Sequence, residues 1–256
     1  MLVLVWGLPG DAPIAAVREQ LRLLDVPTVF ADQRLVLETE VEMVVGDEID
    51  ASLRIRGQRV DLGEVTAVYQ RPYLSTQVAA VARAGPESDA WRHAIRVDDL
   101  LASWCEITPS FVINRCQAMA ANDSKPYQLR QIQRFGWSTP ETLITTDPAA
   151  ARAFWDLHGD VIYKSISGVR SRISRLQPEH LERFSNLSSC PTQFQKYVPG
   201  TDVRVHVVAS EIFASEVECS ADDYRYPTGD SPVVRAISLP SELEDRCRKM
   251  AREMQL

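Results

Sequence analysis

Lysine is scarce in this sequence, and acidic residues outnumber basic ones. The chain has 28 lysine and arginine residues and a formal net charge of −7. This balance argues against non-specific binding to nucleic acid or to an anionic membrane surface, because both need a basic surface. A lysine in so arginine-rich a chain is informative, since its compact charge suits phosphate. The lysines are Lys125, Lys164, Lys196 and Lys249.

Paired cysteines and long apolar runs are also missing. The five cysteines are scattered, with no C-x-x-C pair and no histidine at ligand spacing, so the sequence predicts neither a disulfide framework nor a zinc site. No apolar run approaches the roughly 18 residues of a membrane span. Residues 1–7 are too short, and lack the basic lead-in, to be a secretory signal. We therefore expect a cytoplasmic protein that binds no membrane.

The length of the chain allows two or three small lobes. A strand, a helix and a second strand over residues 2–31 predict a small parallel sheet. A later strand ends in Gln70-Arg71-Pro72-Tyr73, an exposed turn that could equally contact a substrate or have no function. We place the first domain boundary near Arg115.

Two of the lysines occupy informative places. Asp123 or Ser124 is the natural N-cap of a helix that begins near Lys125, and a lysine in the first turn is tolerable if an anion occupies the site. Lys164 ends a strand and is followed by a polar, Gly-containing loop, residues 165–172. Backbone N–H groups and hydroxyls of such a loop can solvate phosphate oxygens. The alternative is an ordinary hairpin with a solvated lysine beside it.

The stretch 193–208, QFQKYVPGTDVRVHVV, reads as strand, tight turn and strand. Its second half alternates strictly, which places Asp202, Arg204 and His206 on one face. That face is either solvated or lines a pocket. Further on, the polar segment CSADDYRYPTGD, residues 219–230, predicts a loop.

These segments, in this order, resemble the ATP-grasp ligases over about residues 118–256. The resemblance implies an α/β (α+β) fold and ATP as cofactor: two lysines approach the nucleotide phosphates, a loop covers the triphosphate, a hinge contacts adenine, and an acid contacts the ribose. Carried over by position, the nucleotide-binding residues are Lys125, Lys164, Ser167, Gly168, Gln195, Lys196, Val198 and Asp202. The implied domains are a parallel-sheet N-terminal domain (1–115), a central ATP-grasp subdomain (116–190) and a C-terminal subdomain (191–256) that looks incomplete.

Closer parallels exist within that family. The loop arginine Arg225 resembles one that RimK-like ligases place near the transferred phosphate, and Arg204 resembles a cation facing phosphate, so both are expected catalytic residues. The turn at Arg71 is similar to one in graspetide synthetases, which are microviridin-type peptide ligases; this implies that Arg71 and Tyr73 bind substrate. Family members hold Mg²⁺ on two further strands, so we assign no metal ligand here and expect the ligands beyond Leu256. We favour a fragment over a protein that has naturally lost these strands.

The expected protein is therefore an ATP-dependent carboxylate–amine or carboxylate–hydroxyl ligase that acts on a precursor peptide through an acyl phosphate, releasing ADP and phosphate. Without the metal strands the chain as given is expected to bind nucleotide weakly and could be inactive. One alternative is a RimK-like or glutathione-synthetase-like ligase for amino acids or small peptides. Another is a non-catalytic nucleotide- or peptide-binding protein. The sequence leaves open the substrate, the bond formed and the oligomeric state, a homodimer included.

Overall fold

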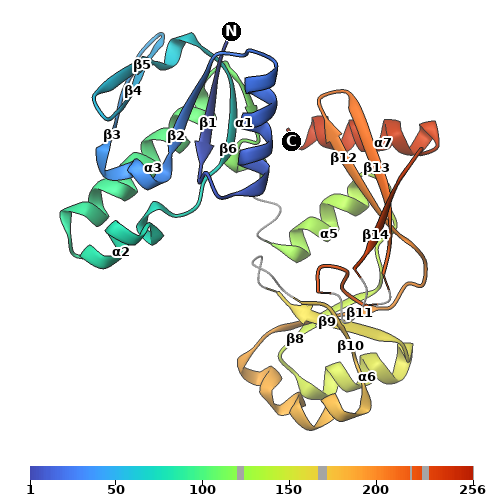
Figure 1. The fold of residues 1–256 in the computed structure, drawn as a ribbon. Helices are drawn as coiled ribbons and strands as arrows, with labels where there is room; N and C mark the ends of the chain where they lie inside the picture. The colour runs from blue at the N-terminus through green and yellow to red at the C-terminus, as the bar shows by residue number, and fades with distance from the viewer. Residues whose placement is uncertain (120–123, 167–171, 220, 227–230, 256) are drawn as a thin grey trace. The chain divides into compact units, whose positions relative to one another are not determined.

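The computed structural model describes residues 1–119, 124–166, 172–219, 221–226 and 231–255. They form two compact units, Met1–Ala118 and Met119–Gln255 (Figure 1). In this described part, one parallel sheet is combined with three antiparallel sheets, which confirms the mixed α/β class. The domain boundaries after residues 115 and 190 stay predictions. No helix within the described ranges has both the length and the apolar character that a membrane span needs.

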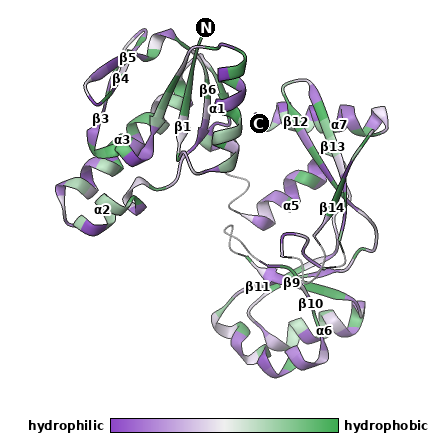
Figure 2. Cartoon of the chain, in the orientation of Figure 1, coloured by the Kyte–Doolittle hydropathy of each residue, from purple (hydrophilic) through white to green (hydrophobic). Residues whose placement is uncertain are grey.

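The first unit is built on the parallel sheet that its opening residues predict. Its strands, in spatial order, are β2 (Thr28–Asp32), β1 (Leu2–Gly7), β6 (Val65–Arg71) and β7 (Phe111–Ile113). Val5 of β1 packs with Ile14 of α1 (Ala12–Leu23) on one face. Trp6 packs with Trp104 of α3 (Asp89–Ile107) on the other. Figure 2 shows hydrophobic and hydrophilic residues together on α1, as expected for a helix that covers a sheet with one side.

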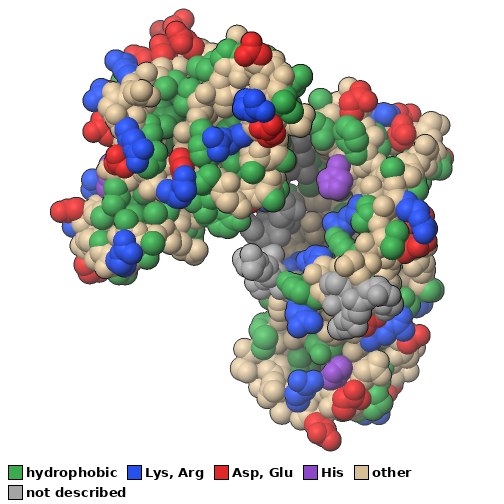
Figure 3. Space-filling model, viewed as in Figure 1, with side chains coloured by type: hydrophobic (Ala, Val, Ile, Leu, Met, Phe, Trp, Pro, Cys, Tyr) green, Lys and Arg blue, Asp and Glu red, His purple; other side chains and the backbone are tan. Residues whose placement is uncertain are grey.

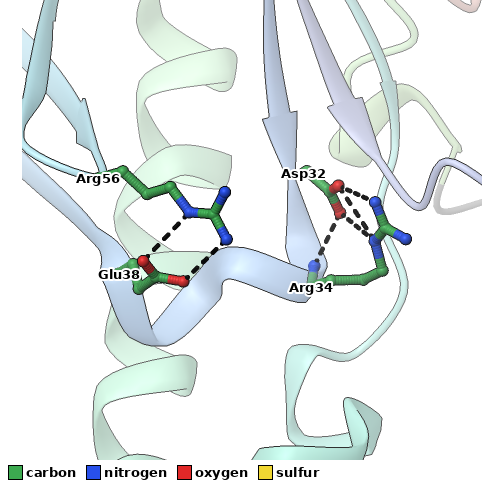
Figure 4. Close-up of polar contacts among 4 residues, drawn as sticks. All are labelled: Asp32, Arg34, Glu38 and Arg56. Atoms are coloured by element: carbon green, nitrogen blue, oxygen red, sulfur yellow. Dashed lines mark hydrogen bonds and ion pairs between the residues drawn. The ribbon is translucent and has the colours of Figure 1, made fainter.

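A three-stranded antiparallel sheet extends this unit. It consists of β3 (Thr39–Val45), β4 (Ile49–Ile55) and β5 (Gln58–Asp61), and follows the short helix η1 (Gln33–Glu38). Asp32 accepts a hydrogen bond from the backbone N–H of Arg34 at 3.0 Å and pairs with its guanidinium at 2.6 Å (Figure 4). Glu38, at the end of η1, pairs with Arg56 at 3.1 Å. The remaining short helices are η2 (Leu62–Glu64), η3 (Ser75–Gln77) and α2 (Ala79–Ala84).

The second unit contains two antiparallel sheets. The first has the order β10 (Ser174–Arg175), β9 (Val161–Ser165), β11 (Thr192–Lys196) and β8 (Thr142–Thr145). One of its faces packs against α6 (Pro148–His158) and η5 (Pro178–Ser189), and this contact buries Phe194, Val161 and Leu187. In Figure 1, α6 lies along one side of these strands. The twelve-residue helix η5 has no counterpart among the sequence expectations.

The second sheet consists of β12 (Asp202–Val208), β13 (Glu211–Glu218) and β14 (Val233–Ile237). Helix α7 (Ser241–Glu253) packs beside β12, and Arg248 donates to the carbonyl of Ser210 in the β12–β13 turn at 2.9 Å. Arg246 donates to the carbonyl of Gly136, just after α5 (Lys125–Arg134), at 3.2 Å. A short helix, α4 (Cys116–Met119), precedes α5. The sequence pattern predicts no strand where β14 lies.

The buried contact between α3 and the parallel sheet gives a direct test of this packing. Trp104 is 2% exposed, so Trp104→Ala should lower the free energy of unfolding by about 3–5 kcal/mol through lost burial and the cavity left behind. Leu24→Ala is the control, because Leu24 is 70% exposed and its truncation should cost less than about 0.5 kcal/mol. Urea unfolding of both variants provides the measurement, and equal losses would contradict this packing.

Candidate functional site

The sheet formed by β8, β9, β10 and β11 has two unlike faces. Cross-strand pairing puts Phe194 beside Tyr163 on one face and Gln193 beside Lys164 on the other. The first face is the one packed against α6 and η5. Because side chains alternate along a strand, the same residues that build this core also hold Lys164 on the opposite face.

Three basic side chains from separate segments of the second unit influence one another. Lys125 begins α5, Lys164 lies on β9, and Arg225 lies in the loop between β13 and β14. Burial lowers the pKa of Lys164, and the charges of Lys125 and Arg225 lower it further. Burial lowers the pKa of Lys125 too, again with help from Arg225. Because nearby positive charge disfavours the charged forms of both lysines, a bound polyanion would stabilise them.

The N-terminus of α5 adds backbone donors beside this cluster. Ser124, one of the two predicted caps, is the N-cap of α5, but its side chain makes no capping hydrogen bond. The first backbone N–H groups of a helix have no intrahelical partners, and the helix dipole favours an anion there. Asp123, the other predicted cap, lies outside the described residues. The position of Lys125 therefore fits an anion site.

Arg225 is held by a buried carboxylate that sequence reasoning did not single out as functional. Its guanidinium donates to Asp223 at 2.7 Å and 2.8 Å, and the Asp223 side chain is 5% exposed. Asp223 also accepts from the backbone N–H of Ile173 at 3.1 Å. The bonds from Arg225, followed by those from the backbone, lower the pKa of Asp223 to about 2. This carboxylate thus fixes the arginine and joins its loop to the segment before β10.

The neighbouring aspartate strengthens the same junction. Asp222 accepts from the backbone N–H of Arg175 at 3.2 Å and from its Nε at 3.0 Å. The guanidinium of Arg175 also lies 3.7 Å from the ring centroid of Tyr197. The loop after β13, strand β10 and the segment after β11 are therefore connected through Arg175.

The predicted hinge begins on β11. Gln195 is 5% exposed, and its Nε2 donates to Oγ1 of Thr142 at 3.0 Å. The backbone N–H of Lys196 donates to the carbonyl of Glu141 at 3.0 Å, and that of Tyr197 to the carbonyl of Asp160 at 2.9 Å. The N–H of Val198 has no such partner within the described ranges, and this residue is 65% exposed. Val198 is therefore the hinge residue whose backbone can donate to a ligand.

Strand β12 carries the predicted polar face. Asp202, Arg204 and His206 alternate along it and are all exposed. The Arg204 guanidinium lies 4.7 Å from the ring centroid of Tyr224, the residue before Arg225. One predicted catalytic arginine therefore contacts the loop segment that contains the other. No contact within the described part joins Asp202 to the three-cation cluster.

Some predicted features cannot be placed. Ser167 and Gly168 lie outside the described residues, as do residues 169–171 of the same loop.

Among the residues that the structure does describe, no three His, Cys, Asp or Glu side chains come together as a metal site. No magnesium ligand is therefore assigned among these residues. On the face drawn in Figure 3, basic and acidic side chains are interspersed.

In the first unit, the predicted substrate residues lie at the carboxyl end of β6, one of the two central strands of the parallel sheet. Arg71 ends β6, and its Nε lies 3.0 Å from Oδ1 of Asp11. The Tyr73 hydroxyl donates to Oδ2 of the same carboxylate at 3.4 Å. The hydrogen bond from Arg71 is the main reason that the pKa of Asp11 is lowered. Asp11 was missed as a site residue, although its place before a helix at the carboxyl end of β1 was the available signal.

Comparison with known proteins gives one consistent pattern. No family model matches the chain. Glutathione synthetase of Salmonella typhimurium (strain LT2) is 30% identical over 112 residues, which are 40% of this chain and 34% of that enzyme. Glutathione synthetase of Shigella flexneri is 32% identical over 104 residues, 34% of this chain and 33% of the enzyme. The match thus spans about a third of the length of these curated relatives.

Solved structures resemble a much larger part of the chain. The ATP-grasp ligase PsnB, complexed with a phosphomimetic variant of its minimal precursor, Mg and ADP, superimposes with a TM-score of 0.77 at 28% identity, covering 99% of this chain and 82% of that one. The macrocyclase MdnC from Microcystis aeruginosa MRC, bound with precursor peptide MdnA, has a TM-score of 0.78 at 18% identity, covering 100% and 84%. The fold is therefore that of these ligases.

The Asp223–Arg225 pair predicts a specific pH dependence of stability. The folded-state pKa of Asp223, about 2, lies below the ordinary 3.8, so its stabilisation is complete at neutral pH and is lost as the pH falls through this interval. Asp223→Asn should lower the free energy of unfolding by about 2 kcal/mol at pH 7. Chemical unfolding of wild type and variant should show this difference shrinking between pH 4 and pH 2.

Asp222→Asn is the matched control for that experiment. Asp222 is adjacent and also pairs with an arginine, but its side chain is 36% exposed, so its loss should cost no more than about 1 kcal/mol. If Asp222→Asn and Asp223→Asn destabilise equally, or if the effect of Asp223→Asn does not depend on pH, the buried ion pair does not have the role described.

Proposed function

We propose that this chain is an ATP-dependent ligase of the ATP-grasp family that joins a carboxylate of a peptide to an amine or a hydroxyl. The single observation that carries the proposal is the cluster of Lys125, Lys164 and Arg225, in which a nucleoside triphosphate would stabilise the charged forms of the two lysines. The resemblance to PsnB, at 28% identity over 99% of this chain, supports a peptide as the substrate.

The proposed reaction has two steps. A carboxylate oxygen attacks the γ-phosphorus of ATP, the bond from that phosphorus to the β–γ bridging oxygen breaks, and ADP leaves. The amine nitrogen or hydroxyl oxygen then attacks the carbonyl carbon of the acyl phosphate, inorganic phosphate departs, and the nucleophile loses its proton. In both steps negative charge moves between oxygens, so fixed cations are the main catalytic requirement.

Each predicted residue has a physical role in this scheme. Lys125 and Lys164 neutralise the phosphates, and Arg225, oriented by Asp223, stabilises the charge that develops during transfer. Arg204 acts beside it, because its guanidinium lies against the ring of Tyr224, the residue before Arg225. Asp202 accepts from the ribose hydroxyls, and the backbone of residues 195–198 contacts the adenine edge, with the Val198 N–H as its donor. Ser167 and Gly168 belong to the loop assigned to the triphosphate.

Magnesium enters this proposal only through the relatives. The PsnB complex contains Mg with ADP, and such an ion supplies charge neutralisation between phosphates when bound. No three His, Cys, Asp or Glu side chains of the described residues come together as a metal site, so no step is assigned to a metal ion.

The first unit contributes the peptide contact in this proposal. Asp11 accepts from both Arg71 and Tyr73 and thereby holds their side chains together at the edge of the parallel sheet. An arginine beside an exposed tyrosine offers a charged fork and an aromatic surface to a peptide. We assign Arg71 and Tyr73 to substrate binding.

A second candidate substrate is a free amino acid or small peptide. The similarity to glutathione synthetases, 30% identity over 112 residues, favours it. Those residues are a minority of each chain, whereas the similarity to PsnB covers nearly all of this one. We therefore place the peptide substrate first.

Removal of Lys164 tests the nucleotide site. Lys164→Ala should weaken ATP binding, measured by calorimetry, at least about tenfold, because a charge-assisted contact to phosphate is lost. The melting temperature should stay the same or rise, since the lysine is half-buried among like charges. Lys249→Ala on α7 is the control, because that side chain is 71% exposed and pairs only with Glu253 among the described residues. Unchanged affinity in Lys164→Ala would refute the assignment.

A product assay separates the substrate classes. Wild-type protein, ATP and Mg²⁺ are offered peptides that contain Glu and Asp together with Lys, Ser or Thr, and in parallel free amino acids and dipeptides. We expect ADP release with the peptides and a mass loss of one water for each bond closed within them. ADP release with the small amines alone would favour the second candidate. Nucleotide binding without ADP release from any substrate would point to a binding protein instead of an enzyme.

A further inference from the structure

A cavity of about 220 Å³ lies in the second unit on the helix-covered face of the β8–β11 sheet. Its apolar wall comes from that sheet and from η5, and includes Tyr163, Phe184 and Phe194. Phe194 lies 6.2 Å from Phe184 and 6.4 Å from Tyr163, between ring centroids, so the three aromatic rings form one surface. Lys164 is on the opposite face of the same strand, so this cavity is distinct from the three-cation cluster.

Two of the side chains that line this cavity, His180 and Arg183, are hydrogen-bond donors. Nδ1 of His180 accepts from the backbone N–H of Gln177 at 3.0 Å, which leaves the proton of the neutral ring on Nε2. The ring lies 5.4 Å from that of Tyr163 in an edge-on arrangement. Arg183, one turn along η5, also lines the cavity and has no ion-pair partner within the described ranges. A ring N–H and a guanidinium are both hydrogen-bond donors, and both favour an anionic acceptor.

The size of the cavity limits the ligand. Pockets for drug-sized molecules measure roughly 300–1,000 Å³, so one of about 220 Å³ suits a molecule about the size of an amino acid. An aromatic wall favours a flat or branched apolar body, and the donors of His180 and Arg183 favour a carboxylate. These requirements together describe a small carboxylic acid with an aromatic or branched aliphatic group.

We propose that this cavity is a second ligand site, which binds a small aromatic or branched aliphatic carboxylate between η5 and the sheet. The apolar group lies against Tyr163, Phe184 and Phe194, and the carboxylate accepts hydrogen bonds from His180 and Arg183. The site does not depend on the proposed nucleotide function, because it shares no lining residue with the three-cation cluster.

Cys190 allows the site to be tested in the intact protein. It lines the cavity and is exposed, whereas Cys116, also exposed, belongs to the first unit and serves as an internal control. The probe is 3-phenylpropionate, with 3-phenylpropionamide as its uncharged analogue. Peptide mass spectrometry measures the rate of iodoacetamide labelling at each cysteine. We expect the carboxylate to slow the labelling of Cys190 at least about threefold without slowing that of Cys116. The concentration of the amide needed for the same protection should be at least about tenfold higher than that of the carboxylate, because a charge-assisted hydrogen bond is lost.

Variants decide whether the donors cause the binding. Arg183→Met keeps most of the side chain's length but removes its charge, and should raise the Kd for 3-phenylpropionate about tenfold. Arg152→Met, on the exposed side of α6, should leave the Kd unchanged. Lys164→Ala should bind the carboxylate normally, so failure of the nucleotide site and failure of this one are distinguishable. Equal protection by acid and amide, no protection of Cys190, or unchanged affinity in Arg183→Met would each overturn the proposal.

Discussion

One buried carboxylate, that of Asp223, fixes the arrangement on which the proposed chemistry depends. It holds the Arg225 guanidinium by two hydrogen bonds and accepts a third from the backbone of Ile173. Desolvation of this carboxylate is unfavourable, and the low pKa of about 2 shows that its partners outweigh that cost. Arg225 in turn lowers the pKa of Lys125 and Lys164, so this ion pair fixes the position of one of the three charges in the cationic cluster.

The sequence predicts those parts of the structure that have a local cause. The strict alternation of residues 202–208 is sufficient to predict β12 and the face shared by Asp202 and Arg204. The order of strand, helix and strand at the start is sufficient for the parallel sheet. The mixed α/β fold follows from these patterns together with the resemblance to ATP-grasp ligases, which the solved structures bear out.

Features with a non-local cause escaped prediction. Asp223 stands in a polar run, and nothing beside it in the chain shows that it will be buried against Ile173, fifty residues away. Asp11 is recognisable as a helix cap, but its role toward Arg71 depends on the pairing of β1 with β6. Strand β14 follows a Pro- and Gly-containing segment and is defined only by its pairing with β13. The roles given to the individual site residues remain predictions for the same reason: they depend on a ligand as well as on the fold.

The pairing of Lys164 with Gln193 and of Tyr163 with Phe194 has a consequence for how this protein can change in evolution. The period along a strand is two residues, so inserting or deleting one residue within β9 would exchange the two faces: the lysine would enter the apolar core, and the tyrosine would replace it beside the other cations. Length variation among descendants of this chain should therefore fall in the connecting loops, while β9 and β11 change only by substitution.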